Sequence, residues 1–211
     1  MKCEVCNQEY GLAHNCAGVA VAQMSQEEAA PPPAGFAPLY YLRLAYNIAL
    51  WDDMSIRRAS RDSKASLYGW FVFAITVGLI SMALILPQYL RTIQVSASVT
   101  IGVLIIGFIV ALVIFGVGTV IQLGLCHLIA KFLFNATGTF VGILRPLLLA
   151  WFVNALIIIP IVGLWATGVA WTAILMLVFE EIEGIGRLQA FFISAGVNLC
   201  FIGLLAIGMR R

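Results

Sequence analysis

The stretch "TIQVSASVTIGVLIIGFIVALVIFGVGTVIQLGLCHLIA", residues 92–130, contains no Asp, Glu, Lys or Arg and decides the fold class. A helix crosses the hydrocarbon core of a bilayer with about 20 apolar residues, so this run is far longer than one crossing requires. It predicts one long, tilted membrane helix whose end, around residues 122–134, projects into the membrane interface.

The whole chain has the composition of an integral membrane protein. Its 211 residues are 62% hydrophobic and 10% charged, whereas soluble domains average about 45–50% apolar and about 25% charged residues. We therefore predict an all-α, polytopic bundle of membrane-spanning helices in contact with the lipid bilayer. With a net charge of +2 and no basic stripe, the chain is not expected to bind nucleic acid.

The membrane domain is expected at residues 65–211, and its apolar runs predict about five spans, at about 67–87, 99–130, 140–160, 164–182 and 188–208. Pro87 is expected to end the first span, because proline lacks the amide that a helix interior needs. Pro160 and Gly163 predict a tight break between the third and fourth spans. Four spans are the alternative, if residues 140–179 partly re-enter the membrane.

The placement of basic residues predicts the orientation of the spans. A dense basic cluster precedes the first span, and cytosolic loops are enriched in Lys and Arg; it comprises Arg57, Arg58, Arg61 and Lys64. The N-terminus is therefore expected in the cytosol and the C-terminus outside, in a bacterial inner membrane. Because the first thirty residues are polar, the first span is expected to serve as the insertion signal and to remain in place.

Residues 38–64 are predicted to form an amphipathic helix. One helical face is apolar, since its members recur at helical spacing; they are Tyr41, Leu44, Ala45, Ile48 and Trp51. We expect this helix to lie in the membrane interface, with its aromatic rings at headgroup depth and the basic run on anionic lipid. The alternative is a helix packed on the cytosolic ends of the spans.

The N-terminal segment 1–17 combines soft metal ligands, and residues 18–37 form a Pro/Ala-rich linker after it. The ligands follow the pattern C-x2-C-x7-H-x-C; they are Cys3, Cys6, His14 and Cys16. Three cysteines and one histidine complete a tetrahedral structural zinc site, which leaves no position open for a substrate. The alternatives are a redox Cys-x-x-Cys pair, although no βαβ pattern surrounds it, and chance clustering of these residues.

Polar residues inside the predicted spans are few. Gln122, His127, Asn154 and Asn198 are candidates for function, because intramembrane polar groups are costly. We interpret the two asparagines as hydrogen-bond partners between helices and His127 as an interfacial residue at the end of its span. The acidic stretch "FEEIEGIGR", residues 179–187, is read as a solvated turn, with binding of a cation or a basic partner as the alternative.

Three segments resemble bacterial Yip-domain membrane proteins. Residues 49–75, "ALWDDMSIRRASRDSKASLYGWFVFAI", are similar to the aromatic and arginine-bearing stretch before the first span of that family. Residues 135–163, "NATGTFVGILRPLLLAWFVNALIIIPIVG", are similar to its third-span region, with a Gly-x-Phe start and a Pro-x-x-Gly end. Residues 181–193, "EIEGIGRLQAFFI", resemble the loop before the fifth span.

The resemblance implies a five-span all-α domain with a cytosolic N-terminus. One departure is Asn154, which stands near the place where many relatives have a proline midway through the third span. Eukaryotic members of the family act in vesicle trafficking and bind prenylated Rab GTPases, but no residue of this chain carries that contact.

No catalytic constellation emerges from the sequence, so we expect a non-enzymatic membrane organiser or adaptor. In this interpretation the zinc segment binds a cytosolic protein partner, and self-association into a homo-oligomer stays open. A small-solute or ion transporter or channel is the alternative function. The discriminating feature is a continuous polar cavity that joins Gln122, Asn154 and Asn198.

Overall fold

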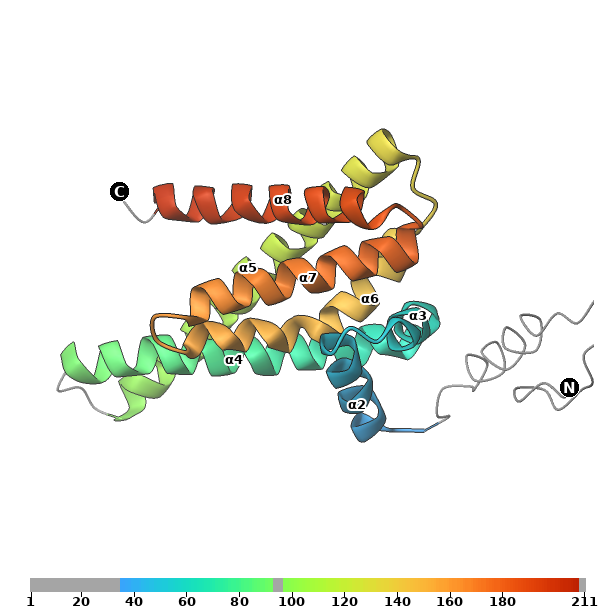
Figure 1. Cartoon of the computed structure of the whole chain (residues 1–211). Helices are drawn as coiled ribbons and strands as arrows, with labels where there is room; N and C mark the ends of the chain where they lie inside the picture. The colour runs from blue at the N-terminus through green and yellow to red at the C-terminus, as the bar shows by residue number, and fades with distance from the viewer. Residues whose placement is uncertain (1–34, 93–96, 209–211) are drawn as a thin grey trace, which may run out of the picture. The chain divides into compact units, whose positions relative to one another are not determined.

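The computed structural model describes residues 35–92 and 97–208, with side chains for 35–84, 87 and 101–200. Residues 1–36 form one unit and residues 37–211 form a second, and all the helices described below belong to the second. Every regular element in the described residues is a helix (Figure 1). The elements are α2 (Pro38–Ala49), α3 (Asp53–Arg61), α4 (Ser63–Thr92), α5 (Ala97–Phe134), α6 (Phe140–Ala150), the 3-10 helix η1 (Trp151–Ile158), α7 (Gly163–Glu183) and α8 (Arg187–Gly208).

Four segments of the described residues are long and apolar enough to cross a membrane: Ser63–Leu84, Ile101–Phe134, Phe140–Ile158 and Gly163–Glu183. The prediction of an all-α membrane protein is confirmed. The prediction of five spans is corrected to four in the part of the chain that the structure describes. The fifth predicted segment does form a helix, α8, but its described side chains end at Cys200, and that part is shorter than a full crossing.

The long uncharged run forms a single helix, α5, as predicted. Its apolar part, Ile101–Phe134, has 34 residues, which at 1.5 Å per residue is about 51 Å, against a hydrocarbon core of about 30 Å. A helix of this length must tilt, and α5 runs diagonally across the directions of α4, α7 and α8 (Figure 1). Only 6% of its most apolar window is buried within the protein, against 39–50% for the other spans. Most of α5 therefore faces lipid.

The core lies where α4, α6, η1 and α7 pack together. Aromatic side chains fill its centre: Phe73 of α4 and Trp151 of η1 have ring centroids 4.5 Å apart. The backbones of α4 and α6 also come close, since a Cβ atom on Gly69 would lie 2.7 Å from the Cβ atom of Leu148. These contacts fix the third span against the first.

The third span is not one α-helix. It changes at Trp151 from α6 to η1, a 3-10 helix of 8 residues, although 3-10 helices rarely exceed 3–4 residues. The indole Nε1 of Trp151 donates a hydrogen bond to Thr119 Oγ1 of α5 over 3.1 Å. Asn154 Nδ2 donates to the carbonyl of Trp151 over 3.0 Å.

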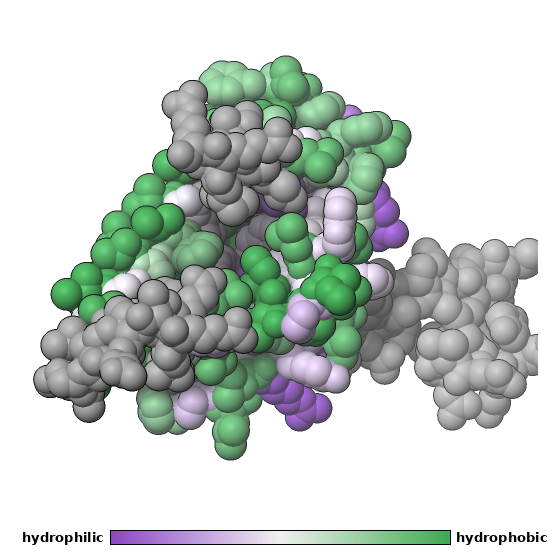
Figure 2. Space-filling model, turned by 90° about the vertical axis from the view of Figure 1, so that its left-hand side faces the viewer, coloured by the Kyte–Doolittle hydropathy of each residue, from purple (hydrophilic) through white to green (hydrophobic). Residues whose placement is uncertain are grey.

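The turn between η1 and α7 is apolar. Its side chains are exposed, with Ile161 at 96% and Val162 at 55% of their accessible area. Backbone amides of this turn find acceptors within it, for example Gly163 N on the carbonyl of Ile159 at 2.9 Å. Figure 2, which shows this end of the bundle, is predominantly green. A turn with internal hydrogen bonds and hydrophobic side chains is compatible with a position at the membrane.

Two predicted helix boundaries are wrong. The single helix expected over 38–64 is two helices, α2 and α3, which are separated by Leu50, Trp51 and Asp52. Trp51 has a φ of 67°, and the Asp52 carboxylate caps α3 by accepting a hydrogen bond from Ser55 N at 3.0 Å. Conversely, α4 continues through Pro87 to Thr92, because membrane helices tolerate a proline better than soluble ones.

Candidate functional site: a polar cluster at one end of the bundle

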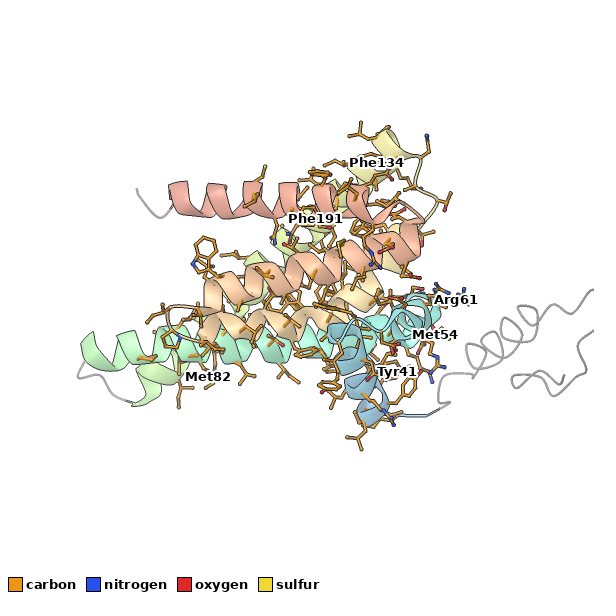
Figure 3. The ribbon with its side chains drawn as sticks, in the orientation of Figure 1. Tyr41, Met54, Arg61, Met82, Phe134 and Phe191 are labelled. Carbon is orange, nitrogen blue, oxygen red and sulfur yellow. The ribbon has the colours of Figure 1, made fainter. Side chains whose placement is uncertain are left out.

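Six elements meet at one end of the helical unit. The start of α4, the end of α5, the start of α6, the end of α7 and the start of α8 lie there with α3, and hydrogen bonds link them. We call this region the charged end. It contains the ion pairs Arg57–Glu181 and Arg187–Glu180 and the close polar contact between His127 and Glu183. Figure 3 shows Arg61 and Tyr41 on this side of the molecule and Met82 toward the other.

Glu183 is the most buried acidic residue of the charged end. It lies in the last position of α7, and its side chain has no accessible area. One carboxylate oxygen, Oε1, contacts Nδ1 of His127 on α5, whose side chain is 13% exposed. The other oxygen, Oε2, is buried and has no hydrogen-bond partner in the structure. His127 is therefore the one polar side chain that the described residues place on this carboxylate.

The backbone around Glu183 is packed just as closely. A Cβ atom on Gly138, in the loop between α5 and α6, would lie 2.6 Å from the carbonyl oxygen of Ile182 and 2.8 Å from Glu183 Oε2. Thr137 N donates to the carbonyl of Glu183 over 3.1 Å. The loop between α5 and α6 thus covers the end of α7 and shields the carboxylate from water.

The acidic stretch 179–187 is not the solvated turn that the sequence favoured. Glu181 accepts a hydrogen bond from Arg57 Nε of α3 over 2.6 Å, and Glu180 accepts one from Arg187 Nε of α8 over 2.8 Å. Burial and, next, the charge of Glu181 raise the pKa of Asp53 in α3 above its ordinary value. The acidic stretch therefore joins α7 to α3, α5 and α8.

Arg145 joins α6 to the junction between α3 and α4. One terminal guanidinium nitrogen donates to the carbonyl of Ser60 over 2.8 Å, and Nε donates to Ser66 Oγ over 3.3 Å. The carbonyl of Ser60 belongs to the last turn of α3, where helix carbonyls lack partners within the helix. Arg145 supplies that partner and also places a positive charge at the negative end of the helix dipole.

The apolar face of α2 packs on protein, as the alternative interpretation of residues 38–64 expected. Tyr41, Leu44, Ala45 and Ile48 are all buried. The Tyr41 hydroxyl donates to Asp62 Oδ2 over 2.5 Å, and its ring stacks on that of Tyr68 with centroids 4.0 Å apart. Burial and this hydrogen bond raise the pKa of Tyr41 well above its ordinary value.

Of the polar residues predicted inside the spans, Gln122 and Asn198 contact each other, whereas Asn154 does not join them. Gln122 Nε2 of α5 donates to Asn198 Oδ1 of α8 over 3.0 Å, and Asn198 Nδ2 donates to Thr172 Oγ1 of α7 over 2.8 Å. This confirms Asn198 as a hydrogen-bond partner between helices. Asn154 instead bonds within η1, so the hydrogen bonds do not join all three residues that the transport alternative requires.

The predicted zinc ligands Cys3, Cys6, His14 and Cys16 lie outside the described residues, as does the linker up to residue 34. Within the described residues, no group of three or more His, Cys, Asp or Glu side chains is placed to hold a metal ion. The zinc site stays a prediction.

Sequence analysis did not predict the main contacts of the charged end. The paired residues are far apart in the chain, for example 124 positions for Arg57 and Glu181 and 56 for His127 and Glu183. Charged residues are rare after residue 92, and this rarity was the one feature of the sequence that marked Glu180, Glu181 and Glu183 as candidates for specific contacts. Comparison with protein-family models, with curated proteins and with solved structures finds no match to this chain.

Proposed function

We propose that this chain is a non-enzymatic membrane organiser of the Yip-like type, whose helix α2 occupies the interface of the leaflet at the charged end. The observation that carries the proposal is that α2 is apolar on two faces. One face is buried in the protein, and the other exposes apolar side chains, which are unfavourable in water: Leu39 (79% exposed), Leu42 (54%) and Tyr46 (58%), followed by Leu50 (61%) directly after the helix.

The direction of α2 supports this position. It runs across the direction of α4 (Figure 1), so when the spans cross a bilayer α2 lies along the membrane plane. Arg43 is exposed next to Leu42, which fits a helix that places apolar side chains among acyl chains and a cation near lipid phosphates. A helix inserted in one leaflet displaces lipid there and favours bending of the bilayer.

Hydrogen bonds of the charged end connect α2 and α3 to the spans. Arg145 of α6 donates to the carbonyl of Ser60 at the end of α3, and Tyr41 of α2 donates to Asp62, which follows α3. Because α2 and α3 both pack on α6, α2 has a fixed position relative to the membrane spans. By this proposal the charged end faces the cytosol, which the positive-inside rule supports. The Cys/His segment binds zinc on that side of the membrane and presents a surface to a protein partner.

Vesicle reshaping tests the proposal. The purified chain is reconstituted at increasing density into vesicles of phosphatidylethanolamine and phosphatidylglycerol, and vesicle diameters are measured by electron cryomicroscopy. We expect smaller or tubular vesicles with the wild-type chain and little change with Leu42→Gln combined with Tyr46→Gln. The matched control, Leu42→Met with Tyr46→Phe, keeps the apolar area and should reshape vesicles like the wild type.

Two results would contradict the proposal. Equal reshaping by the glutamine variant would show that the outer face of α2 is not responsible. Solute flux that is lost in Asn198→Leu would favour the transport alternative instead. For the zinc segment, elemental analysis of the purified chain and of Cys6→Ser should show bound zinc only in the former.

A further inference from the structure

A groove of about 490 Å³ runs between α7 and α8. Trp165, Gly168 and Met176 of α7 line it with Phe191 and Leu199 of α8, and Figure 3 shows Phe191 on the side of α8 toward α7. The exposed fractions of Trp165 (76%) and Leu199 (68%) show that the groove opens to the surroundings of the helices. Because α7 is one of the membrane spans, those surroundings are lipid.

The polar groups in the groove already have partners. Thr172 and Asn198 are the polar side chains that line it, and they hydrogen-bond each other over 2.8 Å. Asn198 also accepts from Gln122. A polar solute in the groove would lose its hydrogen bonds to water and gain few in return. The lining therefore selects a hydrocarbon.

The dimensions fit an acyl chain. The groove extends from Leu164 to Met176, which at 1.5 Å per residue is about 18 Å. At about 30 Å³ for a water-sized group, its volume of about 490 Å³ takes roughly 16 methylene-sized groups. An extended chain of methylenes therefore fits the groove in length and in volume.

A cation stands beyond one end of the groove. Arg187 lies one helical turn before Phe191 at the start of α8, and its side chain is 65% exposed. Its Nε donates to Glu180 of α7. Arg187 and Glu180 each lie four residues from a lining residue of the groove, Phe191 and Met176, so helical spacing places them on the same faces of α8 and α7. A guanidinium binds phosphate oxygens through several N–H groups at once.

We propose that the groove holds one acyl chain of a glycerophospholipid whose phosphate contacts Arg187. This site goes beyond the proposed reshaping of membranes by α2, because it lies on other helices and binds a single lipid. The chain enters between Phe191 and Met176 and ends near Trp165.

Photolabelling with a lipid tests the site. The full chain is reconstituted in phosphatidylethanolamine vesicles that contain phosphatidylglycerol with a diazirine on one acyl chain. After illumination, labelled peptides are identified by mass spectrometry. We expect label on α7 and α8 in excess of that on α5, although α5 exposes more apolar surface to lipid.

Two glycine variants form a matched pair for this experiment. A Cβ atom at Gly168 or at Gly118 of α5 would meet no atom within 4 Å, so both positions have open space where a side chain begins. Gly168→Leu fills the groove and should at least halve the label on α7 and α8. Gly118→Leu lies outside the groove and should leave that label unchanged.

The headgroup contact is tested with Arg187→Gln, which should lower labelling of α7 and α8 by anionic phosphatidylglycerol. Equal label on α5 and on the groove, or label that Gly168→Leu does not reduce, would identify ordinary lipid contact and overturn the proposal. A photoreactive residue in place of Leu199 should capture lipid. Capture of a second copy of the chain there would also overturn it.

Discussion

The His127–Glu183 pair offers the sharpest test of the charged end. We consider His127→Leu, which removes the imidazole and leaves a carboxylate with no accessible area. Its second oxygen already lacks a partner, so the variant leaves both oxygens unpaired. Glu183 also ends α7, where the helix dipole disfavours a negative charge.

These features set the expected magnitude. Leaving a buried polar group without its hydrogen-bond partner costs about 1–3 kcal/mol, and more for a charged group, whereas replacing both partners by apolar residues is often nearly neutral. We therefore expect His127→Leu to lower the free energy of unfolding by about 1–3 kcal/mol. His127→Leu combined with Glu183→Leu should recover most of that loss. Lys131→Leu, one turn further along α5 and exposed, is the control and should stay within about 0.5 kcal/mol.

Reversible unfolding in mixed micelles with increasing SDS, followed by far-UV circular dichroism, measures these free energies. A double-mutant cycle then isolates the coupling between the two residues. If His127→Leu were no more destabilising than Lys131→Leu, or if the double variant were no more stable than His127→Leu, the buried pair would not hold α5 to α7.

Three further predictions concern other contacts of the fold. Because burial and the bond to Asp62 raise the pKa of Tyr41 above its ordinary value of about 10, the Tyr41 hydroxyl of the unfolded chain loses its proton at a lower pH than that of the folded chain. The stability of the wild type should therefore fall as the pH rises above about 10, and Tyr41→Phe should lack that component in thermal melts. Gly163→Ala should destabilise by about 1–3 kcal/mol, since its Cβ atom would lie 2.4 Å from a carbonyl oxygen of η1, while Gly168→Ala meets open space and should not destabilise in the same melts. Arg145→Gln should expose the junction after α3 to limited proteolysis, and Arg145→Lys, which keeps the charge but not the two-point donor geometry, should protect it only in part.

The spans were predictable because a bilayer restricts the backbone severely. Every amide and carbonyl in the hydrocarbon must bond within the protein, so an apolar run as long as that of α5 has few structures open to it. The same reasoning placed α7 within one residue of its observed bounds, Gly163–Glu183. These segments needed no knowledge of their neighbours.

The wrong predictions concern segments whose structure depends on contacts with residues elsewhere in the chain. Within residues 38–64 the helical periodicity runs from Tyr41 to Trp51, and one helix was expected over the whole segment. The hydrogen bonds of Asp52 and Asp62 favour a break at each of these positions. The change to 3-10 helix at Trp151 accompanies its contacts with Phe73 and Thr119, on two other helices. Local pattern carries no information on such contacts.

The candidate site was the least predictable part. A sequence with three nearby glutamates is typical of a solvated turn, and only the structure shows the partner of each one. Glu180 contacts Arg187, Glu181 contacts Arg57 and Glu183 contacts His127. The resemblance to Yip-domain proteins and the zinc segment remain predictions that rest on sequence alone.

The depth of α2 in the bilayer tests the central proposal most directly. A nitroxide is attached to p-acetylphenylalanine in place of Leu42, on the outer face of α2, and in a second sample in place of Arg61, which is exposed at the end of α3. Power-saturation EPR in proteoliposomes then compares collisions with oxygen, which concentrates in lipid, and with a water-soluble nickel chelate. We predict that oxygen dominates at Leu42 and the chelate at Arg61; equal access of the chelate to both positions would contradict an interfacial α2.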